Sequence, residues 1–116
     1  MARRPTVKPF RNAPMLAEAG KLPPTDDGWA YEMKWDGVRA VAVVDGGTVR
    51  LASRNGNDVT IAYPELQPLA EQLPLPAVLD GEIVAVDDEG RASFQRLQAR
   101  MHLRDPAAIR EIRAQV

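Results

Sequence analysis

Cysteine is absent from this 116-residue chain, and histidine occurs once, at position 102. Disulfides and a cysteine nucleophile are therefore excluded, and so is a structural zinc site, which needs several Cys or His ligands. His102 has no suitably spaced partner and is expected to be a surface or helix residue. No apolar run is long enough to span a membrane or to form the core of a secretion signal, which predicts a cytoplasmic protein.

Charge is unevenly distributed, although the formal net charge is only −1. Residues 1–11 hold four cations and no acid, and residues 91–116 hold six arginines against two acids, so each end carries +4. The segment between them holds five cations against fourteen acids, a balance of −9. Basic ends on an acidic body suit contact with a polyanion, and they equally suit a solvated helix face beside an extended leader.

The pattern of apolar residues predicts an α+β protein with a mainly antiparallel sheet and flanking helices. Residues 1–14 are basic and rich in proline, which predicts an extended leader and leaves residues 15–116 as the domain. The last helix ends abruptly, so we expect a piece of a longer protein. Strands are expected over 29–35, 38–45, 48–53, 59–61 and 78–86, and helices over 64–73, 94–103 and from 106 to the end.

Lysine is scarce, and one of the three, Lys34, lies at the end of an alternating segment, just before Asp36 and Gly37. If Asp36 and Gly37 form a two-residue turn, Lys34 faces Arg39 across a hairpin. Repulsion between these cations favours the neutral amine, which a lysine nucleophile requires. Glu32 lies on the same face of the expected strand. An ordinary hairpin with solvated charges explains the segment equally well.

Two further segments carry groups suited to a nucleotide or a nucleic acid. Asp80 and Glu82 lie two apart in an apolar run, so both carboxylates project from one face of a strand, where they can accept hydrogen bonds from ribose or help hold a divalent cation. Gly81 between them is typical of strands that a ligand or another backbone approaches closely. Arg54, at a strand end beside a predicted tight turn, can grip phosphate, although many surface turns look similar.

Together these segments resemble the nucleotidyltransferase superfamily that includes ATP-dependent DNA ligases. Its signature, Lys-x-Asp-Gly-x-Arg, is matched by residues 34–39. The resemblance covers roughly residues 14–116, is most similar to the ligase domain of bacterial non-homologous end-joining ligases, and implies an incomplete, ATP-grasp-like nucleotidyltransferase domain. The other matching blocks are Ser53-Arg54-Asn55-Gly56, Tyr63-Pro64-Glu65-Leu66, Leu79-Asp80-Gly81-Glu82 and Ser93-Phe94-Gln95.

The resemblance implies a mechanism in which Lys34 attacks the α-phosphate of ATP, expels pyrophosphate and forms lysyl-AMP. AMP would then pass to a 5′-phosphate of nicked or broken double-stranded DNA, and the neighbouring 3′-hydroxyl would seal the break. Mg²⁺ or Mn²⁺ is the expected metal, with no ligand assigned. The resemblance also implies that Arg39 orients the nucleotide and the nick phosphate and that Arg54 contacts DNA. Glu82 would contact the ribose, and Glu32 would lie beside the adenine. Asp36 and Asp80 would support the pocket.

The sequence departs from the family pattern because four expected features do not occur before Val116: an adenine-stacking aromatic, a metal-binding glutamate, a pair of lysines and a C-terminal OB-fold domain. The isolated chain, taken as a monomer, is therefore expected to have little or no ligation activity. An RNA ligase, an mRNA capping guanylyltransferase and a non-catalytic nucleic-acid-binding module remain as alternatives. An NAD⁺-dependent ligase is disfavoured, since that group usually has alanine where Arg39 stands.

Overall fold

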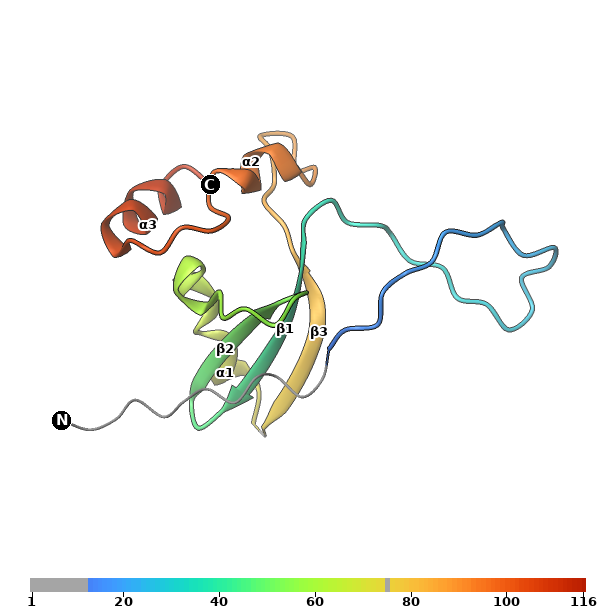
Figure 1. Cartoon of the computed structure of the whole chain (residues 1–116), viewed down its shortest axis with the longest axis horizontal. Coiled ribbons are helices and arrows are strands. Elements are labelled where there is room, and N and C mark those ends of the chain that lie inside the picture. Colours follow the sequence, from blue (N-terminus) through green and yellow to red (C-terminus); the bar gives the residue numbers. More distant parts are fainter. Residues whose placement is uncertain (1–12, 75) are drawn as a thin grey trace.

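The computed structural model describes residues 13–74 and 76–116, so most of the expected leader lies outside the described residues. A three-stranded antiparallel sheet forms the centre of the molecule (Figure 1). Its strands are β1 (Val38–Asp45), β2 (Thr48–Ser53) and β3 (Ala77–Ile83), in the order β2-β1-β3. The α+β architecture and the bounds of β1 and β2 are confirmed, and β3 ends three residues earlier than expected.

The turn between β1 and β2 consists of Gly46 and Gly47, with φ values of 58° and 78°. Positive φ at both central residues matches the right-handed twist of a hairpin, and glycine adopts it without a steric penalty. This turn fixes the register, so that Val44 pairs with Val49. Alternate residues of both strands therefore reach the same face of the sheet.

The segment after β2 contains two short 3-10 helices, η1 (Thr60–Ala62) and η2 (Pro64–Leu66), and a single helical turn, α1 (Leu69–Gln72). The expected strand over 59–61 and the continuous helix over 64–73 are therefore wrong. Pro68 explains the second error, because it has no N–H to donate to the carbonyl of Pro64 and so interrupts the α-helical ladder. The chain makes a 3-10 turn before Pro68 and begins α1 after it.

This segment also occupies the outer edge of β2. Gln67 donates from Nε2 to the carbonyl of Val49 at 2.7 Å and accepts from the N–H of Val49 at 3.0 Å. Thr60 Oγ1 accepts from the N–H of Leu51 at 2.9 Å. Side chains thus replace the hydrogen bonds that a further strand would make, which protects this edge from pairing with another chain.

Two helices follow β3, and both begin with a side-chain cap. Ser93 Oγ accepts from the N–H of Arg96 at the start of α2 (Phe94–Gln98), and Asp105 caps α3 (Pro106–Arg113). Both caps satisfy N–H groups that a helix leaves without intrahelical partners. α2 is five residues shorter than expected. None of the described helices has the length and apolar content needed to cross a membrane.

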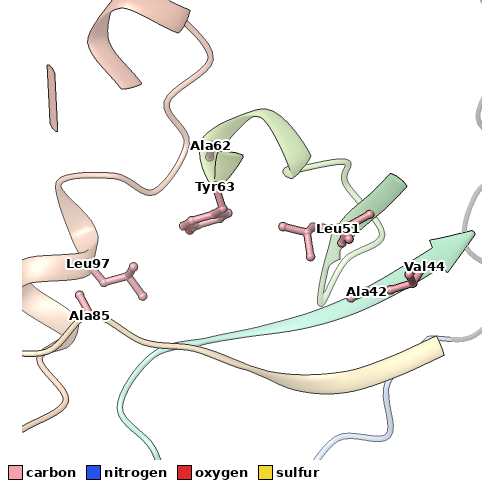
Figure 2. Packing of buried hydrophobic residues seen from close by; sticks show 8 residues of the cluster. Ala42, Val44, Leu51, Ala62, Tyr63, Ala85 and Leu97 are labelled. Carbon is pink, nitrogen blue, oxygen red and sulfur yellow. The ribbon is translucent and has the colours of Figure 1, made fainter. Parts of the chain in front are cut away.

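The hydrophobic core lies between one face of the sheet and the segments that follow β2 and β3 (Figure 2). Leu97 of α2 and Val49 of β2 are almost fully buried, at 1% exposure each. Leu97 therefore belongs to the core, whereas Phe94 of the same helix is only half-buried. The other members of the core cluster are Ala42, Val44, Leu51, Ala62, Tyr63 and Ala85.

The buried guanidinium of Arg100 contacts η1, η2 and the C-terminal residue. Arg100, 4% exposed, pairs with Glu65 at 2.6 Å and donates to the carbonyl of Ala62 at 2.7 Å. Its guanidinium also lies 5.3 Å from the ring centroid of Tyr63 and bonds the carbonyl of Val116 at 3.2 Å. Burial of the Tyr63 phenol raises its pKa, and the positive charge of Arg100 opposes that rise. Sequence reasoning did not identify Arg100.

The segment from residue 13 to residue 37 has no regular secondary structure and loops away from the sheet (Figure 1). The expected strand over 29–35 is therefore wrong, as is the hairpin at Asp36-Gly37. Trp29 and Trp35 are 63% and 55% exposed. Their alternation with polar residues resembles a strand, but no described segment pairs with them, and a strand needs a partner for its backbone groups.

Candidate active site

A hollow of about 440 Å³ lies between the extended segment and the side of the sheet that faces away from the core. Glu32 and Lys34 line it from the segment, Arg39 from β1, and Asp80 and Glu82 from β3. Five of the seven predicted site residues therefore surround one concave space, although they come from segments more than 40 positions apart. Met33, Trp35 and Gly81 complete the lining.

Strand alternation explains why the charged residues share this face. Arg39 lies between Val38 and Ala40, whose parity is that of the core residues of β1, so its side chain projects to the opposite side. The register places Arg39 directly opposite Glu82 on β3. Asp80 lies two residues before Glu82 and projects to the same side, as predicted. The apolar run around Asp80 and Glu82 favours a buried strand, but most residues of β3 are exposed.

Arg39 and Asp80 form a bidentate ion pair. Nε of Arg39 donates to Oδ1 of Asp80 at 2.6 Å, and Nη2 donates to Oδ2 at 2.7 Å. Hydrogen bonding to Asp80 raises the pKa of Arg39, and hydrogen bonding to Arg39 lowers the pKa of Asp80 below its ordinary 3.8. A guanidinium has five N–H donors. The pair uses two, so three remain for an anion in the hollow.

Lys34 does not face Arg39 across a hairpin, which corrects the expected geometry. The two cations instead line the same hollow, and Arg39 is already paired with Asp80. No described carboxylate forms an ion pair with Lys34, and its side chain is exposed. The amine is therefore accessible to a substrate. Asp36 is also exposed and lies outside the lining of the hollow.

Gly37 has a packing role that differs from the predicted turn. A Cβ atom at this position would lie 2.1 Å from the carbonyl oxygen of Ile83 and 2.8 Å from Cγ1 of Val84. Only glycine lets the chain pass this close to the end of β3. At Gly81, by contrast, nothing lies within 4 Å of such a Cβ atom, so the predicted close approach of another backbone is absent there among the described residues.

Arg54 is not part of this hollow. It lies after β2 and lines a second hollow of about 210 Å³, together with His102 and Arg104 from the connection between α2 and α3. Arg39 contributes to the lining of both hollows. His102 is exposed, as expected, but it lies beyond the end of α2. Sequence reasoning missed Arg104, since nothing local indicates that this connection folds back toward the Arg54 turn.

The sequence matches the family described as "ATP dependent DNA ligase domain" over residues 14–116. The chain belongs to this family. Membership confirms the resemblance drawn from the signature at residues 34–39 and disfavours RNA ligase and capping guanylyltransferase as alternatives. It also places the chain in a family of ATP-dependent enzymes.

Relatives within the ligase family agree on the type of protein. The "Multifunctional non-homologous end joining protein LigD" of Mycobacterium bovis is 49% identical over 90 residues, which are 76% of this chain and 12% of that protein. The "DNA ligase" of Natronomonas pharaonis is 46% identical over 103 residues, 84% of this chain and 19% of that protein. The chain thus spans less than a fifth of the length of these relatives.

A solved structure of a family member shares the fold. The structure described as "mycobacterial DNA ligase D complexed with ATP and MES" has a TM-score of 0.56 and 49% identity to this chain. The likeness covers 61% of this chain and 24% of the other. It confirms the predicted fold as that of part of a ligase domain.

Proposed function

We propose that this chain carries the lysine-adenylating site of an ATP-dependent DNA ligase. The observation that carries the proposal is the shared hollow, in which the accessible amine of Lys34 and the guanidinium of Arg39 lie together with carboxylates of β3. Lys34 Nζ, after losing a proton to solvent, attacks the α-phosphorus of ATP. A P–N bond forms, and the P–O bond to pyrophosphate breaks.

The described residues supply the positioning that phosphoryl transfer requires. Asp80 holds Arg39 in one orientation, and the three remaining N–H donors of Arg39 face phosphate oxygens whose charge they neutralise. Glu82 projects from the same face of β3 and accepts hydrogen bonds from the ribose hydroxyls. Glu32, on the opposite wall, accepts from the amino group of adenine.

A divalent cation fits this site as a partner of the nucleotide. No described group of three or more His, Cys, Asp or Glu side chains is arranged to hold a metal ion. Mg²⁺ is commonly held by one or two carboxylates together with substrate phosphates, so ATP itself would provide most of the ligands. No protein ligand is assigned to the cation, since Asp80 is engaged by Arg39 and the proposal places Glu32 at the base and Glu82 at the ribose.

The proposed acceptor of AMP is the 5′-phosphate of nicked or broken double-stranded DNA. Relatives named for non-homologous end joining support a role in the repair of bacterial DNA breaks, and thus a cytoplasmic protein that associates with the nucleoid when bound. Sealing of the break would involve other parts of a longer protein, because the relatives are much longer than this chain.

Mass spectrometry of the intact chain tests the first step. After incubation with ATP and Mg²⁺, we expect one AMP per chain, mapped to the peptide that contains Lys34, and none with GTP. Lys34→Ala should abolish the adduct. Lys21→Ala is the matched control, because Lys21 is an exposed lysine of the same extended segment and lies outside the hollow. An adduct that persists in Lys34→Ala contradicts the proposal, as does DNA binding without any adduct, which would favour a non-catalytic binding module.

A further inference from the structure

The extended segment presents two lysines whose surroundings differ. Residues 13–74 and 76–116 contain only Lys21 and Lys34, and both side chains are exposed. Lys34 lines the active-site hollow beside Arg39, whereas Lys21 lies outside that lining. Both amines are therefore accessible to solvent, but only the amine of Lys34 shares a concave space with a second cation.

The guanidinium of Arg39 is oriented to hold a phosphate group. Asp80 fixes it through Nε and Nη2, at 2.6 and 2.7 Å, and three N–H donors remain. These donors match the geometry of phosphate oxygens. The carboxylates of Glu32 and Glu82 also line the hollow, so the phosphate enters together with Mg²⁺, which offsets their charge. Arg39 can thus hold a small phosphorylated compound next to Lys34.

An amine beside a phosphate-binding cation can react with more than one class of phosphorylated compound. In ATP the electrophile is phosphorus, whereas in an acyl phosphate it is the carbonyl carbon, which one bridging oxygen joins to the phosphorus. A phosphate held by Arg39 keeps that carbon near Lys34, and holding two reactants together raises the rate of the reaction between them. Acetyl phosphate is smaller than ATP, and the hollow of about 440 Å³ admits it.

We propose that Lys34 is a modification site for small acyl phosphates such as acetyl phosphate. Lys34 Nζ, after losing a proton to solvent, attacks the carbonyl carbon. A C–N bond forms, and the C–O bond to the phosphate breaks. The phosphate leaves with the electron pair of that bond, and Arg39 stabilises its charge. The products are an acylated lysine and inorganic phosphate.

Acylation removes the reactivity of Lys34. An amide nitrogen carries no charge and is not nucleophilic, because its lone pair is delocalised into the carbonyl group. An acylated chain therefore forms no bond to AMP, and ATP and acyl phosphate compete for the same amine. The inference uses the hollow of the proposed function, but it does not depend on the capture of AMP.

The relative acetylation of the two lysines tests the role of the phosphate. The unmodified chain is treated, with Mg²⁺ present, with acetyl phosphate or with N-hydroxysuccinimidyl acetate, an acetyl donor without a phosphate, and its peptides are quantified by mass spectrometry. We expect the ratio of initial rates, Lys34 over Lys21, to be about tenfold higher with acetyl phosphate, as for one charge-assisted hydrogen bond. Inorganic phosphate should lower the rate of acetylation by acetyl phosphate at Lys34 but not at Lys21. Comparing two reagents on one chain cancels the intrinsic reactivity of each amine.

Replacing the cation tests whether Arg39 holds the phosphate. In Arg39→Gln the ratio measured with acetyl phosphate should fall about tenfold, to that of the reagent without a phosphate. Arg110→Gln is the matched control, because Arg110 is an exposed cation outside the hollow, and its ratio should equal that of the unmodified chain. The comparison of reagents and the phosphate competition need no variant, so they decide the question even if Arg39→Gln fails to fold.

Equal ratios with the two reagents overturn the inference, and so does a rate at Lys34 that inorganic phosphate leaves unchanged. Equal falls in Arg39→Gln and Arg110→Gln overturn it as well. If the chain captures no AMP but the ratios differ as expected, the proposed adenylation fails and the acylation stands. If AMP is captured at Lys34 while the ratios are equal, the acylation fails and the proposed function stands.

Discussion

The guanidinium of Arg39 reaches diagonally across the sheet and grips both carboxylate oxygens of Asp80, at 2.6 and 2.7 Å, rather than pairing with Glu82 directly opposite. This diagonal pairing holds Arg39 in a fixed orientation before any nucleotide arrives. It also leaves Glu82 available in the hollow, so Asp80 orients Arg39 while Glu82 can contact a ligand.

Replacing Asp80 with Asn should change stability in a way that depends on pH. Because Arg39 lowers the pKa of Asp80 below 3.8, the ion pair contributes its full stabilisation above that value and loses it as the pH falls further. The difference in free energy of unfolding between Asp80→Asn and the unmodified chain should therefore be constant from pH 7 to 5 and shrink below 3.8. Urea titrations at several pH values measure it, and a difference that disappears by pH 5 contradicts the assignment.

The same substitution should impair AMP capture, since Arg39 loses the partner that orients it. We expect the initial rate at limiting ATP to fall about tenfold, in line with the loss of a charge-assisted hydrogen bond. Asp88→Asn is the control. Asp88 forms an ion pair with Arg96 at 3.2 Å, and neither residue lines the active-site hollow. Similar rates for the two variants would show that orientation of Arg39 by Asp80 has no role in the reaction.

Gly37→Ala should move the segment that carries Lys34. The added methyl group would collide with the carbonyl oxygen of Ile83, so either this segment or the end of β3 must shift. We expect a loss of about 1–3 kcal/mol in the free energy of unfolding, together with slower AMP capture. Gly81→Ala provides the stability control, since its methyl group meets open space. An equal effect of both substitutions on unfolding would refute the packing role of Gly37.

Arg100→Met should destabilise the chain by about 3 kcal/mol, because it leaves Glu65 and the carbonyl of Ala62 without their buried partner. Arg113→Gln is the comparison, because it removes the second arginine that pairs with Glu65. Arg113 is half-exposed and lies 3.5 Å from Glu65, so its loss should cost less than about 1 kcal/mol. Chemical denaturation compares them, and equal losses would mean that burial does not determine the strength of these pairs.

Local patterns predicted the structure where local interactions decide it. β1 and β2 have their expected bounds because runs of strand-forming residues continue up to a turn of two glycines, and both strands find their partner within a few residues. The segment 29–35 alternates as a half-buried strand does, yet no described strand lies beside it. Whether an alternating segment becomes a strand thus depends on a neighbour that the pattern does not reveal.

In the candidate site, too, local sequence predicted the features that depend on one strand but not the contacts between distant segments. The carboxylates at 80 and 82 were predicted to share a face because strand geometry requires it, and they do. The partner of Arg39 was not predictable from local sequence, since Asp80 lies 41 positions away and becomes adjacent only through the register of β1 and β3. Arg104 lines the second hollow beside Arg54 only because the connection after α2 folds toward the end of β2.

The different treatment of the two sheet edges has a consequence for assembly. Gln67 and Thr60 already satisfy the outer edge of β2, whereas no described backbone group bonds to the outer edge of β3, where Val78 is 54% exposed. The sheet can therefore be extended at the edge of β3 but not at the edge of β2. Any additional strand, whatever its source, would join beside β3, next to the carboxylates of the active-site hollow, and would form a new wall of that hollow.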